Sequence, residues 1–564
     1  MKNYIKKIGI SVAIILSTAS VYAQSFQLVN NINQSPDDAG LFLNCSFREM
    51  NGKLYYLFTD QSIGKTGLFT SDGTNAGTYR VSPSNLDISG NIIQGGNKLY
   101  FFASDGINGK EPWVSDGTLA GTQMLKNIHS TTDPFNFETN SAVFLSADST
   151  KAFFAANDGT TGNELWVTDG TTAGTVFVMD IFDGTNDSQI KVAPSAMGSN
   201  MKDGKLYFFA VNGTGGFTVN GMEPWVSDGT SAGTFMLKDI QAGYNPSSQS
   251  SNTKHFVEFN NKMYFFAAGS AGNGLWETDG TTTGTQLVYG TTIYRIDEFL
   301  VHNNLLYFTH SNGPTLYTSD GTTAGTNLLT TIPNAQLNNI GTCQMVVANN
   351  TLYFRVVSNS LGSELFMLDG SNQIVNVKDI QTGITNGIVG NIYQERKVLQ
   401  VYDNKVWFLG SDGSFSGALQ VWQSDGTNMG TIALSPLNND GGWAGGNGNG
   451  YNIFATTFGV FMIYNNPTTG AELYFYNGLP TSLQDGAEVL SNVVLYPNPA
   501  TDLVNITSDD VIISKRIYNA FGQMIQEIQG ESTKIDVSEY KVGLYFVVIT
   551  TKNEKSKKSK FIKK

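Results

Sequence analysis

The sequence predicts an all-β protein with two unequal parts, and three observations lead to this prediction. A motif of twelve residues recurs along the chain, as in Glu111–Thr122 (EPWVSDGTLAGT), Glu164–Thr175 (ELWVTDGTTAGT) and Glu223–Thr234 (EPWVSDGTSAGT). The 61 glycines and the 12% of aromatic residues among 564 suit short strands joined by tight turns. No segment shows sustained helical periodicity.

Each repeat is expected to contain four short strands joined by hairpin turns, for example over 255–261, 262–268, 274–280 and 286–290. The second strand of this unit, KMYFFAA, is apolar throughout, which predicts burial on both faces of the sheet. Four-stranded sheets that recur every 41 to 59 residues are typical of a β-propeller. We therefore predict a propeller of eight to nine four-stranded blades over residues 24–478.

The Asp-Gly pair of the motif predicts the turn between the third and fourth strands. The glycine supplies positive φ, the Asp carboxylate can accept from the N–H two residues on, and Gly174 can occupy a second left-handed position. A ring of turn aspartates could instead bind calcium, although calcium needs six to eight oxygens. The candidates are Asp72, Asp116, Asp169, Asp228, Asp279, Asp320 and Asp425. The seventh unit keeps Glu364 and Asp369 but lacks the Gly-Thr end of the motif, which leaves its turn open to question.

Two further residue types recur in the third strand. A residue that repeats in every blade is more often used for packing than for ligand binding. The tryptophans are therefore expected between blades, and the glutamates are expected to accept from N–H groups of turns. These residues are Trp113, Trp166, Trp225, Trp276 and Trp422, and Glu111, Glu164, Glu223, Glu364 and Glu472.

The last unit lacks a fourth strand of its own. Ser25–Pro36 (SFQLVNNINQSP) is similar to the fourth-strand segment of an earlier unit. We therefore predict that the N-terminal strand completes the last blade, because this pairing removes the open edges of the ring.

Residues 1–23 are expected to be a signal peptide, with a basic start, a short apolar run and Val21-Tyr22-Ala23 before the cleavage point. No later stretch is apolar for long enough to cross a membrane. The whole chain has a net charge of −13 and no basic stripe outside its C-terminal end, so nucleic acid is an improbable partner. Cys45 and Cys343 are expected to be free buried thiols.

The motif Glu164–Thr175 resembles the ELWxxDGTxxGT repeat, sometimes called hyalin-like, of bacterial surface proteins. The resemblance extends over about Gly40 to Gly478. It implies a fold built from repeated blades, and it does not imply a particular reaction.

A polar linker, 479–492, precedes a segment of alternating strands and turns over 493–564, which predicts a small β-sandwich. Its signatures resemble the type A sorting domain of the type IX secretion system. The resemblance implies export across the outer membrane by the type IX machinery, followed by removal of the domain and attachment of the cargo to surface lipopolysaccharide. The matching residues are Tyr496, Pro497, Asn498, Pro499, Phe521, Gly522, Gly543 and Tyr545.

The catalytic motifs of common enzymes are missing from the sequence, because the four histidines lack metal-ligand spacing and there is neither a nucleophile elbow nor a phosphate loop. Trp443 lies on a Gly-rich loop outside the repeat and is a candidate for stacking on a glycan or protein ligand. We therefore predict a secreted, cell-surface module for binding or adhesion that needs no cofactor. A polysaccharide-active enzyme on the same scaffold is the alternative, since a pair of carboxylates could be assembled in space.

Overall fold

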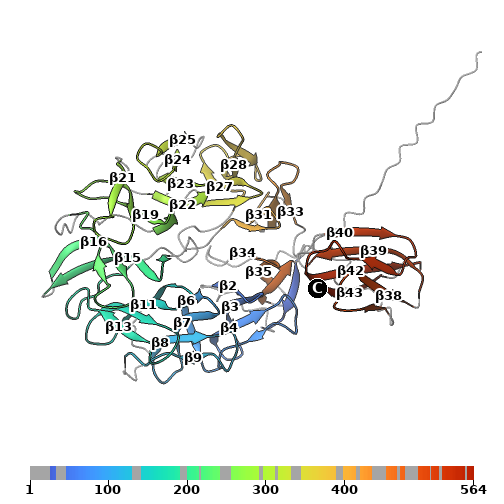
Figure 1. The fold of residues 1–564 in the computed structure, drawn as a ribbon, viewed down its shortest axis with the longest axis horizontal. Helices are drawn as coiled ribbons and strands as arrows, with labels where there is room; N and C mark the ends of the chain where they lie inside the picture. The colour runs from blue at the N-terminus through green and yellow to red at the C-terminus, as the bar shows by residue number, and fades with distance from the viewer. Residues whose placement is uncertain are drawn as a thin grey trace, which may run out of the picture. The chain divides into compact units, whose positions relative to one another are not determined.

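The computed structural model describes residues 26–32, 46–129, 142–190, 200–214, 217–241, 256–290, 296–310, 315–331, 344–388, 398–413, 420–434, 453–466, 470–476, 493–508, 510–519, 524–552 and 556–564. All regular elements in these ranges are β-strands, which confirms the all-β class (Figure 1). The chain divides into two compact units, one formed by Phe26–Asn477 and the other containing the described residues from Val493 onward.

The larger unit contains nine four-stranded sheets in its described residues. The first three contain β2 Phe47–Met50, β3 Lys53–Asp60, β4 Lys65–Ser71 and β5 Tyr79–Arg80; β6 Asp87–Gly95, β7 Lys98–Ser104, β8 Lys110–Ser115 and β9 Gln123–Met124; and β10 Val143–Ala147, β11 Ala152–Asn157, β12 Asn163–Thr168 and β13 Val176–Met179. The next three contain β14 Met201–Lys202, β15 Lys205–Thr214, β16 Phe217–Ser227 and β17 Phe235–Met236; β18 Phe256–Phe259, β19 Lys262–Ala267, β20 Gly274–Thr278 and β21 Gln286–Gly290; and β22 Ile296–His302, β23 Leu305–His310, β24 Thr315–Ser319 and β25 Asn327–Thr331. The last three contain β26 Gln344–Ala348, β27 Thr351–Ser358, β28 Gly362–Leu368 and β29 Ile374–Lys378; β30 Gln400–Tyr402, β31 Lys405–Gly410, β32 Gln420–Ser424 and β33 Ile432–Ala433; and β34 Ile453–Thr456, β35 Gly459–Asn466, β36 Gly470–Tyr476 and β1 Gln27–Asn30.

The turns between first and second strands follow directly from the sequence. A two-residue hairpin turn that matches the twist of its strands needs positive φ at both central residues, which asparagine, aspartate and glycine tolerate. Asn260 and Asn261 have φ values of 47° and 60°, and Asn303 and Asn304 have values of 48° and 58°. Because the two turn residues fix which residues of the flanking strands pair, Phe259 with Lys262 and His302 with Leu305, the local sequence sets the register of each hairpin.

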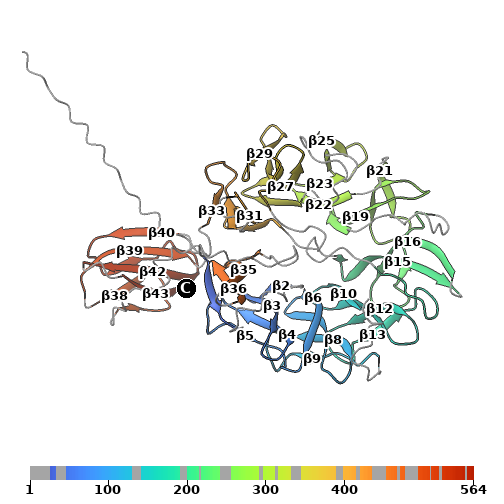
Figure 2. The same ribbon diagram turned by 180° about the vertical axis from the view of Figure 1, so that it is seen from behind.

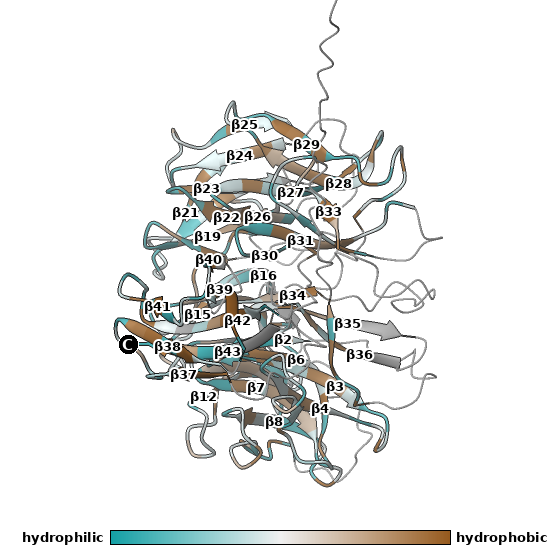
Figure 3. Cartoon of the chain, turned by 90° about the vertical axis from the view of Figure 1, so that its right-hand side faces the viewer, coloured by the Kyte–Doolittle hydropathy of each residue, from teal (hydrophilic) through white to brown (hydrophobic). Residues whose placement is uncertain are grey.

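Consecutive sheets pack face to face through hydrophobic clusters. Trp225 of the fourth sheet, for example, packs with Phe153 and Val167 of the third. Nine such clusters each draw residues from two neighbouring sheets, and one of them combines Phe47 and Tyr56 of the first sheet with residues of the ninth. Figures 1 and 2 show the succession of sheets from both sides. In Figure 3, brown apolar segments follow many strands, whereas many turns are teal and hydrophilic.

The N-terminal strand completes the ninth sheet, as predicted. Strand β1 is antiparallel to β36, with Gln27 opposite Phe475 and Leu28 opposite Tyr474. The Val29 side chain is buried in the cluster between the ninth and first sheets. The first and last strands of the larger unit are therefore neighbours although more than four hundred residues separate them.

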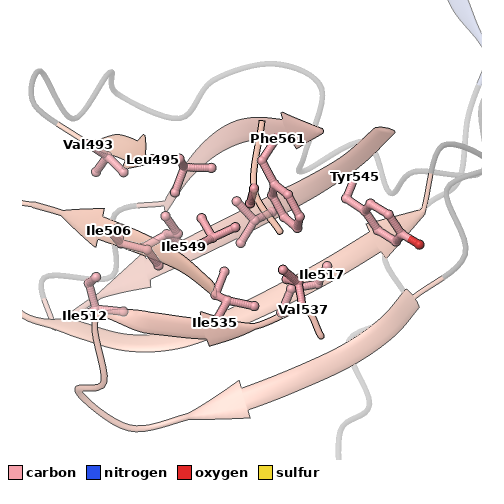
Figure 4. Packing of buried hydrophobic residues seen from close by; sticks show 13 residues of the cluster. Val493, Leu495, Ile506, Ile512, Ile517, Ile535, Val537, Tyr545, Ile549 and Phe561 are labelled. Atoms are coloured by element: carbon pink, nitrogen blue, oxygen red, sulfur yellow. The ribbon is translucent and has the colours of Figure 1, made fainter. Parts of the chain in front are cut away.

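The smaller unit contains two sheets in its described residues. One is formed by β37 Val494–Tyr496, β38 Leu503–Thr507 and β41 Lys534–Asp536, and the other by β40 Met524–Gln529, β39 Ile512–Asn519, β42 Gly543–Thr551 and β43 Ser556–Lys563. Residues from both sheets share one apolar core, in which Leu495 and Ile535 meet Ile517 and Phe561 (Figure 4). Two sheets over one core agree with the small sandwich expected from the sequence.

Candidate functional site

The repeated Asp-Gly turns share one hydrogen-bond pattern. Oδ1 of Asp169 accepts from the N–H of Thr171 at 2.8 Å and from its hydroxyl at 2.7 Å, and the Thr171 hydroxyl oxygen accepts from the N–H of Gly174 at 3.0 Å. The same three contacts, at 2.6 to 3.0 Å, occur at every aspartate considered above as a calcium ligand, namely Asp72, Asp116, Asp169, Asp228, Asp279, Asp320 and Asp425. Each carboxylate is thus an acceptor within its own turn.

The pKa values of these aspartates agree with their role as hydrogen-bond acceptors within the turn. Hydrogen bonds from the threonine lower the pKa of five of the carboxyls, those of Asp169, Asp228, Asp279, Asp320 and Asp425. Among the residues that the structure describes, no group of three or more His, Cys, Asp or Glu side chains is arranged to hold a metal ion.

The two glycines of the motif have different reasons to be glycine. The first has positive φ, with 88° at Gly170, as the sequence predicted. The expectation of a left-handed Gly174 was wrong, because its φ does not lie in that region. A Cβ at Gly174 would overlap the carboxylate of Asp169. The second glycine is therefore required by the close approach of the carboxylate, and not by backbone conformation.

The seventh unit forms a tighter turn, which explains why it lacks the Gly-Thr end. Oδ1 of Asp369 accepts from the N–H groups of Ser371 and Gln373, each at 2.8 Å, and Asn372 has a φ of 58°. The backbone N–H of Asp369 donates to the carbonyl of Gln373 at 2.9 Å. This turn needs no second glycine.

In four of the sheets, the repeated glutamate holds the connection that leaves the sheet. Oε2 of Glu164 accepts from the N–H of Ile181 at 2.9 Å, and Oε1 accepts from the N–H groups of Phe182 and Ser188 at 3.3 and 3.1 Å. Equivalent bonds join Glu111 to Ile128 and His129, Glu223 to Ile240 and Gln241, and Glu364 to Ile380, Gln381 and Gly387. The predicted role as acceptors from turn N–H groups is confirmed for these four, and Glu472 is also buried.

Burial makes these glutamates unusual acids. Loss of hydration raises the pKa of Glu111, Glu223 and Glu364 to about 7 and that of Glu164 to about 8, while the backbone donors act in the opposite direction. Carboxyls with raised pKa values are frequent at catalytic sites. Here each one is fully enclosed and bonded to backbone of its own unit, so the shift reflects a structural position.

The tryptophans fill the spaces between sheets, as predicted. All five are buried, and Trp166 stacks on Phe154 with ring centroids 6.1 Å apart. Trp422 stacks in the same way on Phe408 at 6.5 Å. The turn aspartates and four of the glutamates therefore have hydrogen-bond partners within the larger unit, and the five tryptophan rings pack in its hydrophobic clusters.

The C-terminal signatures converge on the last strand, β43. The Tyr545 ring stacks on Phe561 with centroids 5.5 Å apart, as the side chains in Figure 4 show, and Gly543 is paired with Lys563. On the opposite edge of β43, the Asn498 side chain bonds to the backbone of Lys560 and Ile562. The sequence indicated that these residues belong to the motifs of one domain, but it could not show that they contact the same strand.

Some of the remaining signature residues lie within the described residues and others lie outside them. Tyr496 is half exposed on β37, between Pro497 and the core residue Leu495, and Pro499 precedes the buried Ala500. Several predictions fall outside the described residues: the signal peptide 1–23, the linker 479–492, Cys45, Cys343, Trp443, Phe521 and Gly522. Within the described ranges, no helix is long and apolar enough to cross a membrane.

Comparison with protein families identifies the smaller unit. The family described as the secretion system C-terminal sorting domain matches residues 494–564. These residues are a type IX sorting domain. The protein is therefore exported by type IX secretion to the cell surface or the extracellular space, and the type IX machinery is its partner in export.

Other relatives are more distant. Beta-agarase D of Zobellia galactanivorans is 32% identical over 83 residues, which are 15% of this chain and 17% of the agarase. A match of this length does not extend over the nine sheets.

Solved structures give weak likenesses. A prolyl endopeptidase has a TM-score of 0.37 and 9% identity over 77% of this chain and 57% of its own. The computationally designed protein Ika8 has a TM-score of 0.36 and 13% identity, over 68% and 95%. PorZ, a surface component of the type IX secretion system of Porphyromonas gingivalis, has a TM-score of 0.26 and 13% identity, over 93% and 81%. Such low TM-scores do not establish a shared fold or function.

Proposed function

We propose that residues 26–477 form a nine-bladed β-propeller of ELWxxDGTxxGT repeats that acts as a non-catalytic binding or adhesion module outside the cell. The proposal of a ring rests on the contacts between the ninth and first sheets. The Phe47 and Phe454 rings lie 5.5 Å apart, and a Cβ at Gly73 would approach the Phe475 ring to 2.5 Å.

A related contact occurs between several of the earlier sheets, where a tyrosine of the second strand covers the glycine of the Asp-Gly pair in the next sheet. Tyr264 of the fifth sheet covers Gly321 of the sixth, and Tyr353 of the seventh covers Gly426 of the eighth. Gly73 has the equivalent place in the first sheet, but the ring that covers it, Phe475, belongs to the third strand of the ninth sheet. A succession of sheets in which each packs on the next, and the ninth packs on the first, is what a propeller requires.

The internal use of the repeated side chains carries the proposal of a binding module. The Glu164 carboxylate accepts from the backbone N–H groups of Ile181, Phe182 and Ser188. The Asp169 carboxylate accepts from Thr171. Groups engaged in this way hold the scaffold, and a ligand would contact residues in which the blades differ. Trp443 is proposed as one such residue. The proposal includes no cofactor, so the melting temperature of the purified protein is expected to be the same in calcium and in EDTA.

The route to the surface completes the proposal. We infer that residues 1–23 direct the chain to the periplasm, and that the sorting domain is removed when the cargo is attached to lipopolysaccharide. The first step follows from the residue pattern at the N-terminus, and the second follows from the resemblance to type A sorting domains.

The test is binding of the purified mature protein to an array of neutral and sulfated polysaccharides and surface glycans. Saturable binding without release of reducing ends supports the module. The enzyme alternative takes its support from the similarity to the agarase, and it predicts new reducing ends from at least one polysaccharide. Trp443→Ala should weaken binding, while Trp407→Phe, a change of a fully buried side chain on β31, serves as the matched control for stability.

A further inference from the structure

The last strand of the sorting domain has partners on both of its edges. Along one edge β43 is antiparallel to β42. Along the other edge, Asn498–Ala500 makes four hydrogen bonds to the stretch Lys560–Lys564. Backbone bonds run from Ala500 N–H to the carbonyl of Ile562 at 2.7 Å and from Lys564 N–H to the carbonyl of Ala500 at 2.9 Å.

The other two bonds come from one side chain. Oδ1 of Asn498 accepts from the N–H of Ile562 at 2.9 Å, and Nδ2 donates to the carbonyl of Lys560 at 3.1 Å. A carboxamide that accepts and donates to the same strand does what a peptide group of a neighbouring strand would do. This is needed because the flanking Pro497 and Pro499 have no N–H and cannot form a backbone ladder.

These bonds fix which side chains of β43 face outward. Phe561 and Lys563 are buried, whereas Lys560, Ile562 and Lys564 are exposed, with Ile562 46% exposed. A slip of one residue would reverse this alternation and expose Phe561. An edge strand without partners would also offer its free N–H and C=O groups to other chains.

We propose that Asn498 is a positioning residue for export, which holds β43 in the register and pairing that the type IX machinery must meet. The proposal rests on export through the sorting domain and is independent of what the larger unit binds. Asn498 acts through β43 and need not touch the machinery.

The first experiment compares Asn498→Ala and Asn498→Asp in the full chain. The aspartate keeps an acceptor for Ile562 but cannot donate to Lys560. We expect faster hydrogen exchange at the C-terminal peptide 556–564 and at least a five-fold fall in the surface fraction for both. Asn505→Ala is the matched control, since Asn505 Nδ2 donates to the carbonyl of Tyr496 at 3.2 Å and Asn505 lies on β38, which pairs with β37 and β41. This control should be exported within about two-fold of the wild type.

A cross-link separates positioning from general stability. Ala500 and Lys563 form a parallel β-bridge, so Ala500→Cys with Lys563→Cys can restore the pairing by a disulfide in the periplasm. In the Asn498→Ala background the oxidised pair should recover export, and in the otherwise unchanged chain it should leave export intact. Normal export of both Asn498 variants despite faster exchange would refute the proposal. So would failure of the cross-link to rescue, or a block of export by the cross-link alone, which would mean that β43 has to detach.

Discussion

Replacing Asp169 with alanine removes the acceptor of two hydrogen bonds in the turn that ends at Thr175. A hydrogen bond contributes about 0.5–1.5 kcal/mol net, and Asp169 is exposed, so we expect a loss of about 1–2 kcal/mol. Gly174→Ala should cost about 1–3 kcal/mol, because its Cβ would overlap the Asp169 carboxylate. In the double variant that carboxylate is absent, so the loss of stability should be smaller than the sum of the two single losses by about 1 kcal/mol.

Thermal and urea unfolding of the purified mature protein measure the loss. If the 452 residues of the larger unit unfold together, their unfolding entropy is about 2.1 cal/mol/K per residue. The loss of stability then lowers the melting temperature by only about 1–2 °C. Hydrogen exchange of the peptide 163–179 is therefore the sharper assay, since it reports local opening of one turn. Asp169→Asn keeps the acceptor and is the control.

Two results would contradict the reasoning. Additive effects of Asp169→Ala and Gly174→Ala would mean that the carboxylate does not define the space for the glycine. Unchanged melting of Asp169→Ala in EDTA, together with loss of a stabilisation by calcium in the wild type, would show that Asp169 is a calcium ligand.

Three other predictions test different parts of the molecule. Deletion of Phe26–Asn33 should expose the edge of β36 and cause aggregation in size-exclusion chromatography; a soluble monomer of unchanged stability would show that the ring closes otherwise. Burial raises the pKa of Glu164 in the folded state to about 8 from 4.5. The contribution of the protonated Glu164 to the free energy of unfolding is therefore fully present below about pH 4.5 and is lost as the pH rises through about 8. The melting temperature of Glu164→Gln should thus depend less on pH between 5 and 8.5 than that of the wild type; parallel curves would be inconsistent with a raised pKa. Removal of Val493–Lys564 should leave a folded protein in the periplasm by cell fractionation, and detection of Lys564 in the surface form by mass spectrometry would show that the domain is retained.

Features that depend on short separations could be predicted from the sequence. The bond from Thr171 to Asp169 spans two residues, and the twin asparagines 260 and 261 set their hairpin by themselves. The positions of the strands and of the turns between them follow from such local rules. The buried tryptophans were also predictable, since a repeated aromatic residue on a central strand has few other uses.

Contacts between distant segments could not be predicted in the same way. Asn498 and Ile562 are 64 residues apart, and no pattern in either segment indicates that a side-chain amide stands in for a strand. The reason for Gly174 was predicted wrongly. The sequence shows that a glycine recurs at this position, but it does not show whether positive φ or the lack of room for a Cβ requires it. The Glu164 partners could be foreseen as turn N–H groups, whereas the identity of Ile181 and Phe182 depends on how the next connection folds back.

For the binding function proposed above, the geometry of the repeated turn indicates which residues are free to set ligand specificity. Asp116, Thr118 and Gly121 are bound to one another, so a change at any of them disturbs the turn. Leu119, between Thr118 and Gly121, is 57% exposed, and Met429, one position further along the equivalent turn of the eighth sheet, is 91% exposed. A tip residue of this kind contributes its side chain to the surface and leaves the hydrogen-bond pattern intact. Blades can therefore diverge at their tips without loss of the fold, and differences in ligand should follow these tip residues and not the invariant aspartates.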